Sequence, residues 1–233
     1  MGMDIISGLN CFGLTRQEAT IYTVLLENGR MTGYEVAKRT NISRSNVYTA
    51  LSGLVDKGAA DFIEGEPMYY SPVAIHDFLN NKLYTLNEIK EDILLKAPKP
   101  IGPVDQYATV KGDVNILAKL RNMIDNAQFR IYFSAMDEVV QKLGPNLTDA
   151  VARGLKIVVI TESPFVLENA QVYQNREPST QVRLITDSAQ ALTGDYIKDD
   201  NHCTCLYSGK QNLIDLIKDA LKNEIRLITI KGR

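Results

Sequence analysis

The 233-residue chain contains no tryptophan, three cysteines, two histidines and no apolar run close to the length of a membrane span. Cys11, Cys203 and Cys205 are too few and too unevenly spaced to form a disulfide framework. A membrane-spanning helix needs about 20 consecutive apolar residues. The N-terminus also lacks a basic region followed by a long apolar one. These absences predict a cytoplasmic protein with no membrane partner.

The sequence also offers little for metal or cofactor chemistry. The segment HCTC places Cys203 and Cys205 on one face of a strand and His202 on the other. A zinc site needs its ligands together, so this arrangement splits the ligand set across a sheet. We therefore expect two buried thiols, no metal site and no cofactor.

The chain does contain enough apolar material for two cores, with 45% hydrophobic and 23% charged residues. The stretch APKPIGP carries Pro98, Pro100 and Pro103, which cannot continue a helix. We therefore predict a domain at residues 1–75 and a second at 104–233. A linker helix and a proline-rich hinge at 76–103 join them.

Residues 34–58, YEVAKRTNISRSNVYTALSGLVDKG, carry two apolar helical repeats around a polar turn. Asn41 can adopt the left-handed conformation that ends the first helix, and the hydroxyl of Ser43 is expected to cap the second. Two helices joined in this way form a helix-turn-helix, and the alternative is an ordinary helical hairpin. The apolar stripe of the second helix consists of Val47, Ala50, Leu51, Leu54 and Val55.

The polar residues opposite this stripe are candidates for contact with double-stranded DNA, because the second helix of such a motif reaches base edges. Arg44, Ser45 and Asn46 open that helix and are expected to read bases, whereas Tyr48 and Thr49 are expected to contact phosphates. The full candidate set is Thr32, Tyr34, Lys38, Arg39, Ser43, Arg44, Ser45, Asn46, Tyr48, Thr49 and Ser52.

The flanking segments complete the pattern of a winged helix. Thr15 and Glu18 form a capping box before another amphipathic helix, and AADFIEGEPMYYSPV predicts two short strands around a turn. The cues LT..EA.IY..LL..G, GYE.AK and SRSNVY.AL..LV.KG resemble the TrmB family of prokaryotic transcriptional regulators, strongly over residues 9–75 and more weakly beyond. The resemblance implies sequence-specific binding to a DNA operator.

Charge is distributed unevenly over the predicted winged helix. Residues 1–75 carry six basic and eight acidic residues, whereas residues 30–58 carry five basic and two acidic. Glu64 and Glu66 place negative charge on the wing. We therefore expect the second helix of the motif to provide most of the binding, and a single subunit to bind weakly.

The segment from Ala74 to Ala97 predicts a helix that joins two subunits. Its apolar residues alternate at spacings of four and three, as in a short coiled-coil seam, with Lys90 at one place where another apolar residue would fall. The alternative is a helix packed on its own domain, with Phe78 and Ile89 widening the stripe. The candidate dimerisation residues are Leu79, Leu83, Leu86 and Ile93.

Residues 104–233 alternate strand-like and helical segments. RIYFSA and LKIVVIT are strand-like, and DVNILAKLRNMIDNA and PNLTDAVARG are helical, which predicts βαβ units and a largely parallel sheet. Three further strands, QVRLIT, ALTGDYI and HCTCLYS, follow, with KDDN as a hairpin tip. The final helix is KQNLIDLIKDALKNEI. The predicted fold class is therefore a two-domain chain of α+β and α/β character.

This half resembles the phospholipase D-like domain that TrmB regulators use as an effector and dimerisation module, in VKGDVNILAKLRNMIDNAQFRIYFSA and DAVARGLKIVVIT. Enzymes of that fold need a histidine nucleophile, a lysine two residues later and an aspartate five further on. With Asp199 as the aspartate, the other places hold Leu192 and Gly194. With Asp200, they hold Thr193 and Asp195. The resemblance thus implies the fold without hydrolysis, and we do not expect an enzyme.

An effector would bind beyond the carboxyl ends of parallel strands, where ligands sit in open α/β sheets. The candidate strand ends are short polar runs, although such residues also favour turns and helix caps. We leave a sugar effector open, because many TrmB relatives sense sugars through additional C-terminal sequence and this chain ends soon after the sheet. The candidate residues are Ser134, Asp137, Thr161, Glu162 and Asp187.

These features together predict a homodimeric, sequence-specific DNA-binding transcriptional regulator controlled by a small-molecule effector. Two other classes are weighed against it. A phosphodiesterase-like enzyme with an accessory winged helix is disfavoured by the missing histidine and lysine. A protein-binding winged-helix factor would explain the acidic wing.

Overall fold

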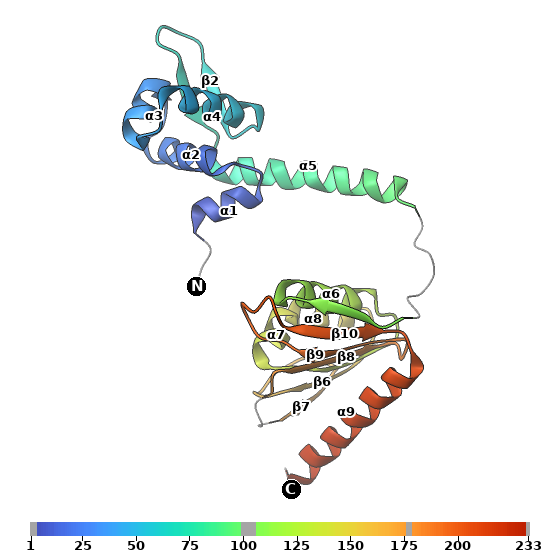
Figure 1. Ribbon diagram of the computed structural model, residues 1–233. Coiled ribbons are helices and arrows are strands. Elements are labelled where there is room, and N and C mark those ends of the chain that lie inside the picture. Colours follow the sequence, from blue (N-terminus) through green and yellow to red (C-terminus); the bar gives the residue numbers. More distant parts are fainter. Residues whose placement is uncertain (1–3, 99–105, 176–178, 232–233) are drawn as a thin grey trace. The chain divides into compact units, whose positions relative to one another are not determined.

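The chain divides into two compact units, residues 1–99 and 100–233 (Figure 1). The computed structural model describes residues 4–98, 106–175 and 179–231. Pro100 and Pro103 of the predicted hinge lie outside the described residues. None of the helices in these ranges is long and apolar enough to cross a membrane.

The N-terminal unit is a helical domain with a small antiparallel sheet. Its strands are arranged in the order β1-β3-β2. The two strands predicted around the turn form a hairpin, in which Phe62 pairs with Tyr70 and Ile63 with Tyr69. Its elements are α1 (Ile5–Cys11), α2 (Arg16–Asn28), β1 (Met31–Thr32), α3 (Gly33–Thr40), α4 (Arg44–Asp56), β2 (Ala60–Ile63), β3 (Tyr69–Pro72) and α5 (Ile75–Lys96).

Local capping signals set the helix boundaries in this unit. Thr15 and Glu18 form the predicted capping box at the start of α2. Asn41 ends α3 in the left-handed conformation, with φ of 55°. The prediction for Ser43 is wrong in part, because it occupies the N-cap position of α4 but its side chain makes no capping hydrogen bond. Its hydroxyl instead lies 3.3 Å from the Ser45 hydroxyl.

The start of α5 is anchored in the N-terminal core. Phe78 is 2% exposed and meets Tyr22 edge to face, with ring centroids 5.6 Å apart. The Tyr22 hydroxyl donates a 2.8 Å hydrogen bond to the carbonyl of Val73, just before the helix. Leu79 packs against the same core. The direction of α5 is therefore fixed by its first turn.

The rest of α5 carries an apolar stripe that its own unit does not cover. Leu83, Leu86 and Ile93 are 48%, 48% and 57% exposed. Ile89 is also 48% exposed. The alternative prediction, a helix packed on its own domain, is therefore correct for Phe78 and wrong for Ile89.

The C-terminal unit is a seven-stranded sheet in the order β4-β10-β9-β8-β5-β6-β7. The prediction of a largely parallel sheet is wrong, because β5 with β6 and β6 with β7 are the parallel pairs and the other four pairs are antiparallel. The strands are β4 (Ala108–Lys111), β5 (Arg130–Ser134), β6 (Lys156–Thr161), β7 (Gln171–Gln174), β8 (Gln181–Thr186), β9 (Gln190–Asp195) and β10 (Thr204–Ser208).

Connection length explains the mixed strand directions. A helical segment joins β5 to β6, which lets these strands run parallel. A short turn joins β8 to β9, and such turns connect antiparallel neighbours. A longer loop, residues 196–203, joins β9 to β10, which also run antiparallel. The sequence pattern missed β4 and β7, which form the two edges of the sheet.

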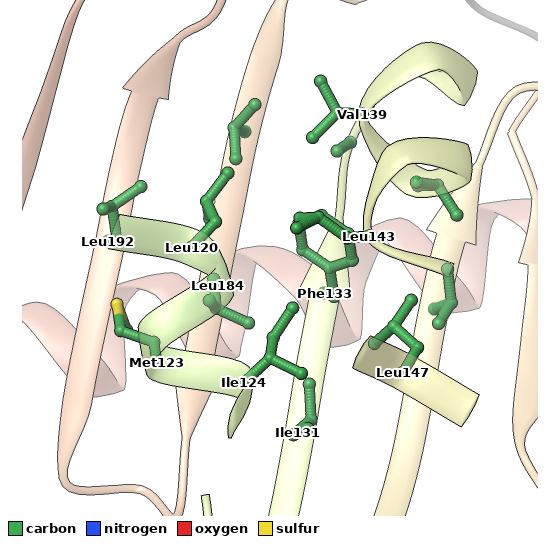
Figure 2. Packing of buried hydrophobic residues seen from close by; sticks show 14 of the residues in the cluster. Leu120, Met123, Ile124, Ile131, Phe133, Val139, Leu143, Leu147, Leu184 and Leu192 are labelled. Atoms are coloured by element: carbon green, nitrogen blue, oxygen red, sulfur yellow. The ribbon is translucent and has the colours of Figure 1, made fainter. Parts of the chain in front are cut away.

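Helices cover both faces of this sheet, as Figure 1 shows. Figure 2 shows Leu120, Met123 and Ile124 of α6 in the same core as Ile131 and Phe133 of β5. On the other face, the predicted final helix, α9, packs through Leu213, Ile214, Ile217 and Leu221. The helices of this unit are α6 (Asp113–Asn126), α7 (Asp137–Lys142), α8 (Gly144–Ala152) and α9 (Gln211–Lys231).

Candidate functional site

The carboxylate of Glu18 links the start of α2 to the end of α4. Glu18 is 6% exposed, and its Oε2 accepts hydrogen bonds from the backbone N–H of Thr15 at 2.7 Å and from Lys57 Nζ at 2.5 Å. Lys57 immediately follows α4. Gly53 of α4 faces the same carboxylate, leaving no room there for a side chain. These contacts fix how α4 lies against α2.

Opposing effects act on the pKa of Glu18. Burial alone would raise it, but the hydrogen bonds from Lys57 and Thr15 stabilise the ionised form. The hydrogen bonds together outweigh burial, so the pKa of Glu18 lies below its ordinary value. The carboxylate is therefore charged at neutral pH.

The outward face of α4 carries the predicted contact residues. Arg44 is in its first turn, and the Arg44 guanidinium carbon lies 4.6 Å from the ring centroid of Tyr34 on α3. This stacking limits the orientations open to the guanidinium. A side chain on Gly33 would bring its Cβ to 2.6 Å from Cε1 of Tyr48, so the glycine leaves room for that ring at the start of α3. Two tyrosines thus join the starts of α3 and α4.

The structure gives one predicted contact residue a different role. Thr32 is half-buried, and its hydroxyl donates to Glu35 Oε2 at 2.9 Å and accepts from the Glu35 backbone N–H at 3.3 Å. It therefore caps α3. The exposed candidates are Tyr34, Lys38, Arg39, Ser43, Arg44, Ser45, Asn46, Tyr48, Thr49 and Ser52.

Sequence reasoning missed two polar residues that border this face. Arg16 and Gln17, at the start of α2, line one hollow together with Thr49 of α4. Arg30 lies beside the hairpin, with its guanidinium carbon 5.4 Å from the ring centroid of Tyr69. The capping box located the start of α2 but could not show which helix lies next to it.

Three of the five predicted effector residues line one polar hollow in the C-terminal unit. Ser134, Thr161 and Glu162 come from the carboxyl ends of β5 and β6. Across the hollow, Arg183 Nη1 of β8 forms a 2.8 Å ion pair with Glu224 Oε2 of α9. The hollow therefore combines hydroxyl groups with an ion pair that is largely buried.

Asp137 lies beside this hollow and organises the strand ends. Its Oδ1 accepts hydrogen bonds from the Thr161 hydroxyl at 2.7 Å and from the Ser163 backbone N–H at 2.8 Å. Hydrogen bonds from Ser163 and Thr161 hold the pKa of the Asp137 carboxyl below its ordinary value, although partial burial opposes them. Asp137 ties together the ends of two neighbouring strands.

The prediction that Asp187 belongs to this site is wrong. β8 runs antiparallel to β5, with Thr186 opposite Ile131, so the carboxyl end of β8 lies at the opposite end of β5. There the Asp187 carboxylate accepts three hydrogen bonds of 2.7–2.9 Å from the backbone N–H groups of residues 128–130. Burial alone would raise the Asp187 pKa, but these three hydrogen bonds lower it. Asp187 has a structural role in the β8–β9 turn.

The cysteines of the HCTC segment are buried as predicted. Cys203 and Cys205 are 6% and 1% exposed, whereas His202 is exposed. Burial raises the pKa of the Cys205 thiol to about 12, so that thiol is protonated at neutral pH. The parts of the chain that the structure describes hold no cluster of three histidine, cysteine or acidic residues that could bind a metal ion.

Comparison with protein families identifies the class of both units. A model described as the sugar-specific transcriptional regulator TrmB matches residues 9–76. A second, for the N-terminal subdomain of the TrmB effector-binding domain (EBD), matches residues 106–224, half of the chain. Both models describe one class of protein, the transcriptional regulators. The chain belongs to the TrmB family of that class.

Individual relatives cover part of the same sequence. The chain is 34% identical over 152 residues to the sugar-sensing regulator TrmBL1 of Pyrococcus furiosus, covering 60% of this chain and 42% of TrmBL1. It is 27% identical over 174 residues to the uncharacterized protein YrhO of Bacillus subtilis, covering 73% of this chain and 62% of YrhO. The chain thus spans less than two thirds of the length of either relative.

A solved structure of the archaeal chromatin protein TrmBL2 aligns with 95% of this chain and 96% of its own. The sequence identity is 19% and the TM-score is 0.45.

We predict that Glu18→Gln destabilises the full chain by about 1–3 kcal/mol at neutral pH, because it removes the charge that pairs with Lys57. The folded pKa of Glu18 lies below the ordinary value of 4.5, so its stabilisation is complete above that pH and is lost as the pH falls through the folded pKa. The difference between parent and variant should therefore shrink below about pH 4.

Denaturant unfolding followed by circular dichroism between about pH 3 and pH 7 measures this difference. Glu27→Gln, an exposed position on the same helix, is the matched control and should change little. An equal and pH-independent loss in both variants would contradict the prediction.

Proposed function

We propose that this chain is a sequence-specific, double-stranded DNA-binding transcriptional regulator whose N-terminal unit is a winged helix-turn-helix with α4 as its recognition helix. The observation that carries the proposal is the exposed start of α4, with Arg44 held on the ring of Tyr34. A guanidinium held in place can donate two hydrogen bonds to one guanine, which discriminates between bases. Membership of the TrmB family supports the same function.

The charges around α4 favour binding through the helix rather than through the hairpin. Lys38, Arg39 and Arg44 are exposed on α3 and α4, whereas Glu64 and Glu66 are exposed at the tip of the hairpin. Phosphate groups attract the first set and repel the second. The winged unit therefore makes few phosphate contacts, and its affinity depends on base contacts and on a second subunit. A protein-binding role would instead need the hairpin to provide the main contact.

We predict that Arg44→Ala weakens binding to an operator selected from random DNA by about 1–3 kcal/mol at fixed salt. Arg44→Lys should recover little of this loss, because lysine keeps the charge but cannot form the two-pronged contact. Tyr34→Ala should weaken binding in the same direction, and Tyr34→Phe should not, because the ring supports the guanidinium.

Gel shift or fluorescence anisotropy with the full chain measures these affinities. Arg121→Ala, which removes an exposed arginine from the C-terminal unit, is the control. If Arg44→Ala binds the selected operator as tightly as the parent does, α4 is not the recognition helix.

We propose that the exposed stripe of α5 forms the contact between two subunits of a homodimer. Leu83, Leu86 and Ile93 recur at coiled-coil spacing and are about half exposed in the single chain. A second copy of α5 would remove this apolar area from water. The anchored first turn of α5 would then hold each winged unit in a fixed relation to the seam.

We predict that Leu83→Glu converts the dimer to a monomer, because a charge would be placed in a desolvated contact. Leu95→Glu is the matched control, since Leu95 is 86% exposed and lies away from the stripe on the same helix. Sedimentation of the full chain measures the association state, and circular dichroism checks the fold. A Leu83→Glu variant that stays dimeric would place the interface elsewhere.

We propose that the C-terminal unit is a phospholipase D-like fold that binds a small polar effector instead of catalysing hydrolysis. Leu192, in the place of the nucleophilic histidine, is buried in the core beneath α6 (Figure 2). The polar hollow at Ser134, Thr161 and Glu162 offers hydroxyl and carboxylate groups that suit a hydroxylated ligand, but its volume of about 20 Å³ holds about one water molecule, so the ligand would have to widen it on binding. A sugar fits this chemistry, and the match to the TrmB effector-binding domain supports the assignment.

We predict that a polar metabolite which raises the melting temperature of the parent does so less for Ser134→Ala and Glu162→Ala, because both lose polar atoms at the hollow. Thermal shift with a panel of sugars and small polyols identifies the ligand. Glu168→Ala, exposed outside the hollow, is the control.

Regulation requires that the ligand also changes operator affinity, because a ligand acts only through its preference between two states. Equal stabilisation of parent, both pocket variants and the control would place the effector site elsewhere.

A further inference from the structure

A second hollow lies under α9, at the opposite end of β5 from the polar hollow. It encloses about 300 Å³, within the range of small-molecule sites. Arg130 opens β5, Ser188 lies in the β8–β9 turn, and one side of α9 forms the wall. We call this space the basic cavity. Its cationic residues are Arg130, Lys218 and Lys222.

Among the residues that the structure describes, the lining of the basic cavity contains three cations and no acidic residue. Lys222 Nζ lies 3.3 Å from Asp219 Oδ1, an exposed pair that is screened by water. Within residues 4–98, 106–175 and 179–231, neither Arg130 nor Lys218 has an ion pair within 4.0 Å. The cavity thus keeps a net positive charge.

Asp187 is an acidic group next to Ser188 of the lining, and it does not neutralise this charge completely. The positive charge of Arg130 contributes to lowering the pKa of the Asp187 carboxylate. Both of its oxygens, however, already accept backbone hydrogen bonds from residues 128–130. The guanidinium of Arg130 therefore keeps donors for a ligand.

The remaining lining is apolar with two hydroxyl groups. Tyr132, Leu221 and Ile225 provide an aromatic ring and aliphatic surface, and Tyr132 and Ser188 add hydroxyls. A carboxylate or phosphate suits the three cations, and a ring or short aliphatic group suits the apolar surface. This combination differs from the polar hollow, where Glu224 already neutralises Arg183.

We propose that the basic cavity binds a small organic anion, with its phosphate or carboxylate held by Arg130, Lys218 and Lys222 and its apolar part resting on Tyr132 and Leu221. The concave shape favours a small molecule over duplex DNA, because the cations line a half-open hollow and not an extended ridge. The site lies in the C-terminal unit and shares no lining residue with the polar hollow. It gives the C-terminal unit a second ligand of a different chemical class.

Isothermal titration of the full chain with phenyl phosphate, inorganic phosphate and phenol, at constant ionic strength and without operator DNA, tests the proposal. We expect phenyl phosphate to bind more tightly than inorganic phosphate, and phenol not to bind measurably. Lys218→Gln with Lys222→Gln, and separately Arg130→Gln, should each weaken phenyl phosphate binding by at least about tenfold.

Two control variants separate this site from other effects. Lys111→Gln with Arg121→Gln removes two exposed cations of the same unit outside the cavity and should leave phenyl phosphate binding unchanged. Ser134→Ala should also leave it unchanged, because it alters the polar hollow alone. These results would hold even if the proposed DNA or effector function failed.

Several outcomes would overturn the proposal. An equal loss in the Lys111/Arg121 control would show a diffuse effect of net charge. Equal binding of phosphate and phenyl phosphate would remove the role of the apolar surface. Displacement of phenyl phosphate by a short duplex of unrelated sequence, lost in the Lys218/Lys222 variant, would assign the cations to nucleic acid. Circular dichroism of each variant establishes that a loss of binding is not a loss of fold.

Discussion

The buried carboxylate of Glu18 is the interaction on which the presentation of α4 depends. It completes the cap of α2 and, through Lys57, holds the end of α4 against the start of α2. Gly53 makes this approach possible because any side chain there would displace the carboxylate. The core between these helices fixes their separation, but apolar contacts have little directional preference. The charged hydrogen bonds supply that direction. The contact of Glu18 with Lys57, at the end of α4, therefore also sets the orientation of the exposed start of α4.

In the C-terminal unit, β5 contributes to both cavities, because its residues alternate between the two faces of the sheet. Ile131 and Phe133 enter the core beneath α6, whereas Tyr132 packs with the cluster beneath α9. Tyr132 and Ser134 belong to the basic cavity and the polar hollow, respectively. α9 contributes Lys218 and Lys222 to the first and Glu224 to the second. One strand and one helix therefore form two cavities of different charge.

Local signals in the sequence were sufficient to predict most helices and strands of the N-terminal unit. The Thr15–Glu18 capping box and the left-handed Asn41 depend on residues a few positions apart, so the sequence contains their full cause. Strand direction depends on which strands become neighbours, and that information is not local. The prediction for Asp187 failed for this reason, since a polar residue after a strand looks the same at either edge of the sheet. Arg16 and the basic cavity were missed because their partners are distant in sequence.

The acidic hairpin and the exposed stripe of α5 both affect the expected affinity for DNA. Glu64 and Glu66 leave the winged unit with few phosphate contacts, so the proposed operator binding by one subunit is weak. Linking two such units makes the second contact intramolecular, and the gain depends on how rigidly the link holds them. The Tyr22–Phe78 contact and the Tyr22 hydrogen bond to Val73 fix the first turn of α5 to the winged core. Any movement of the proposed pair of α5 helices would therefore be transmitted to both α4 helices.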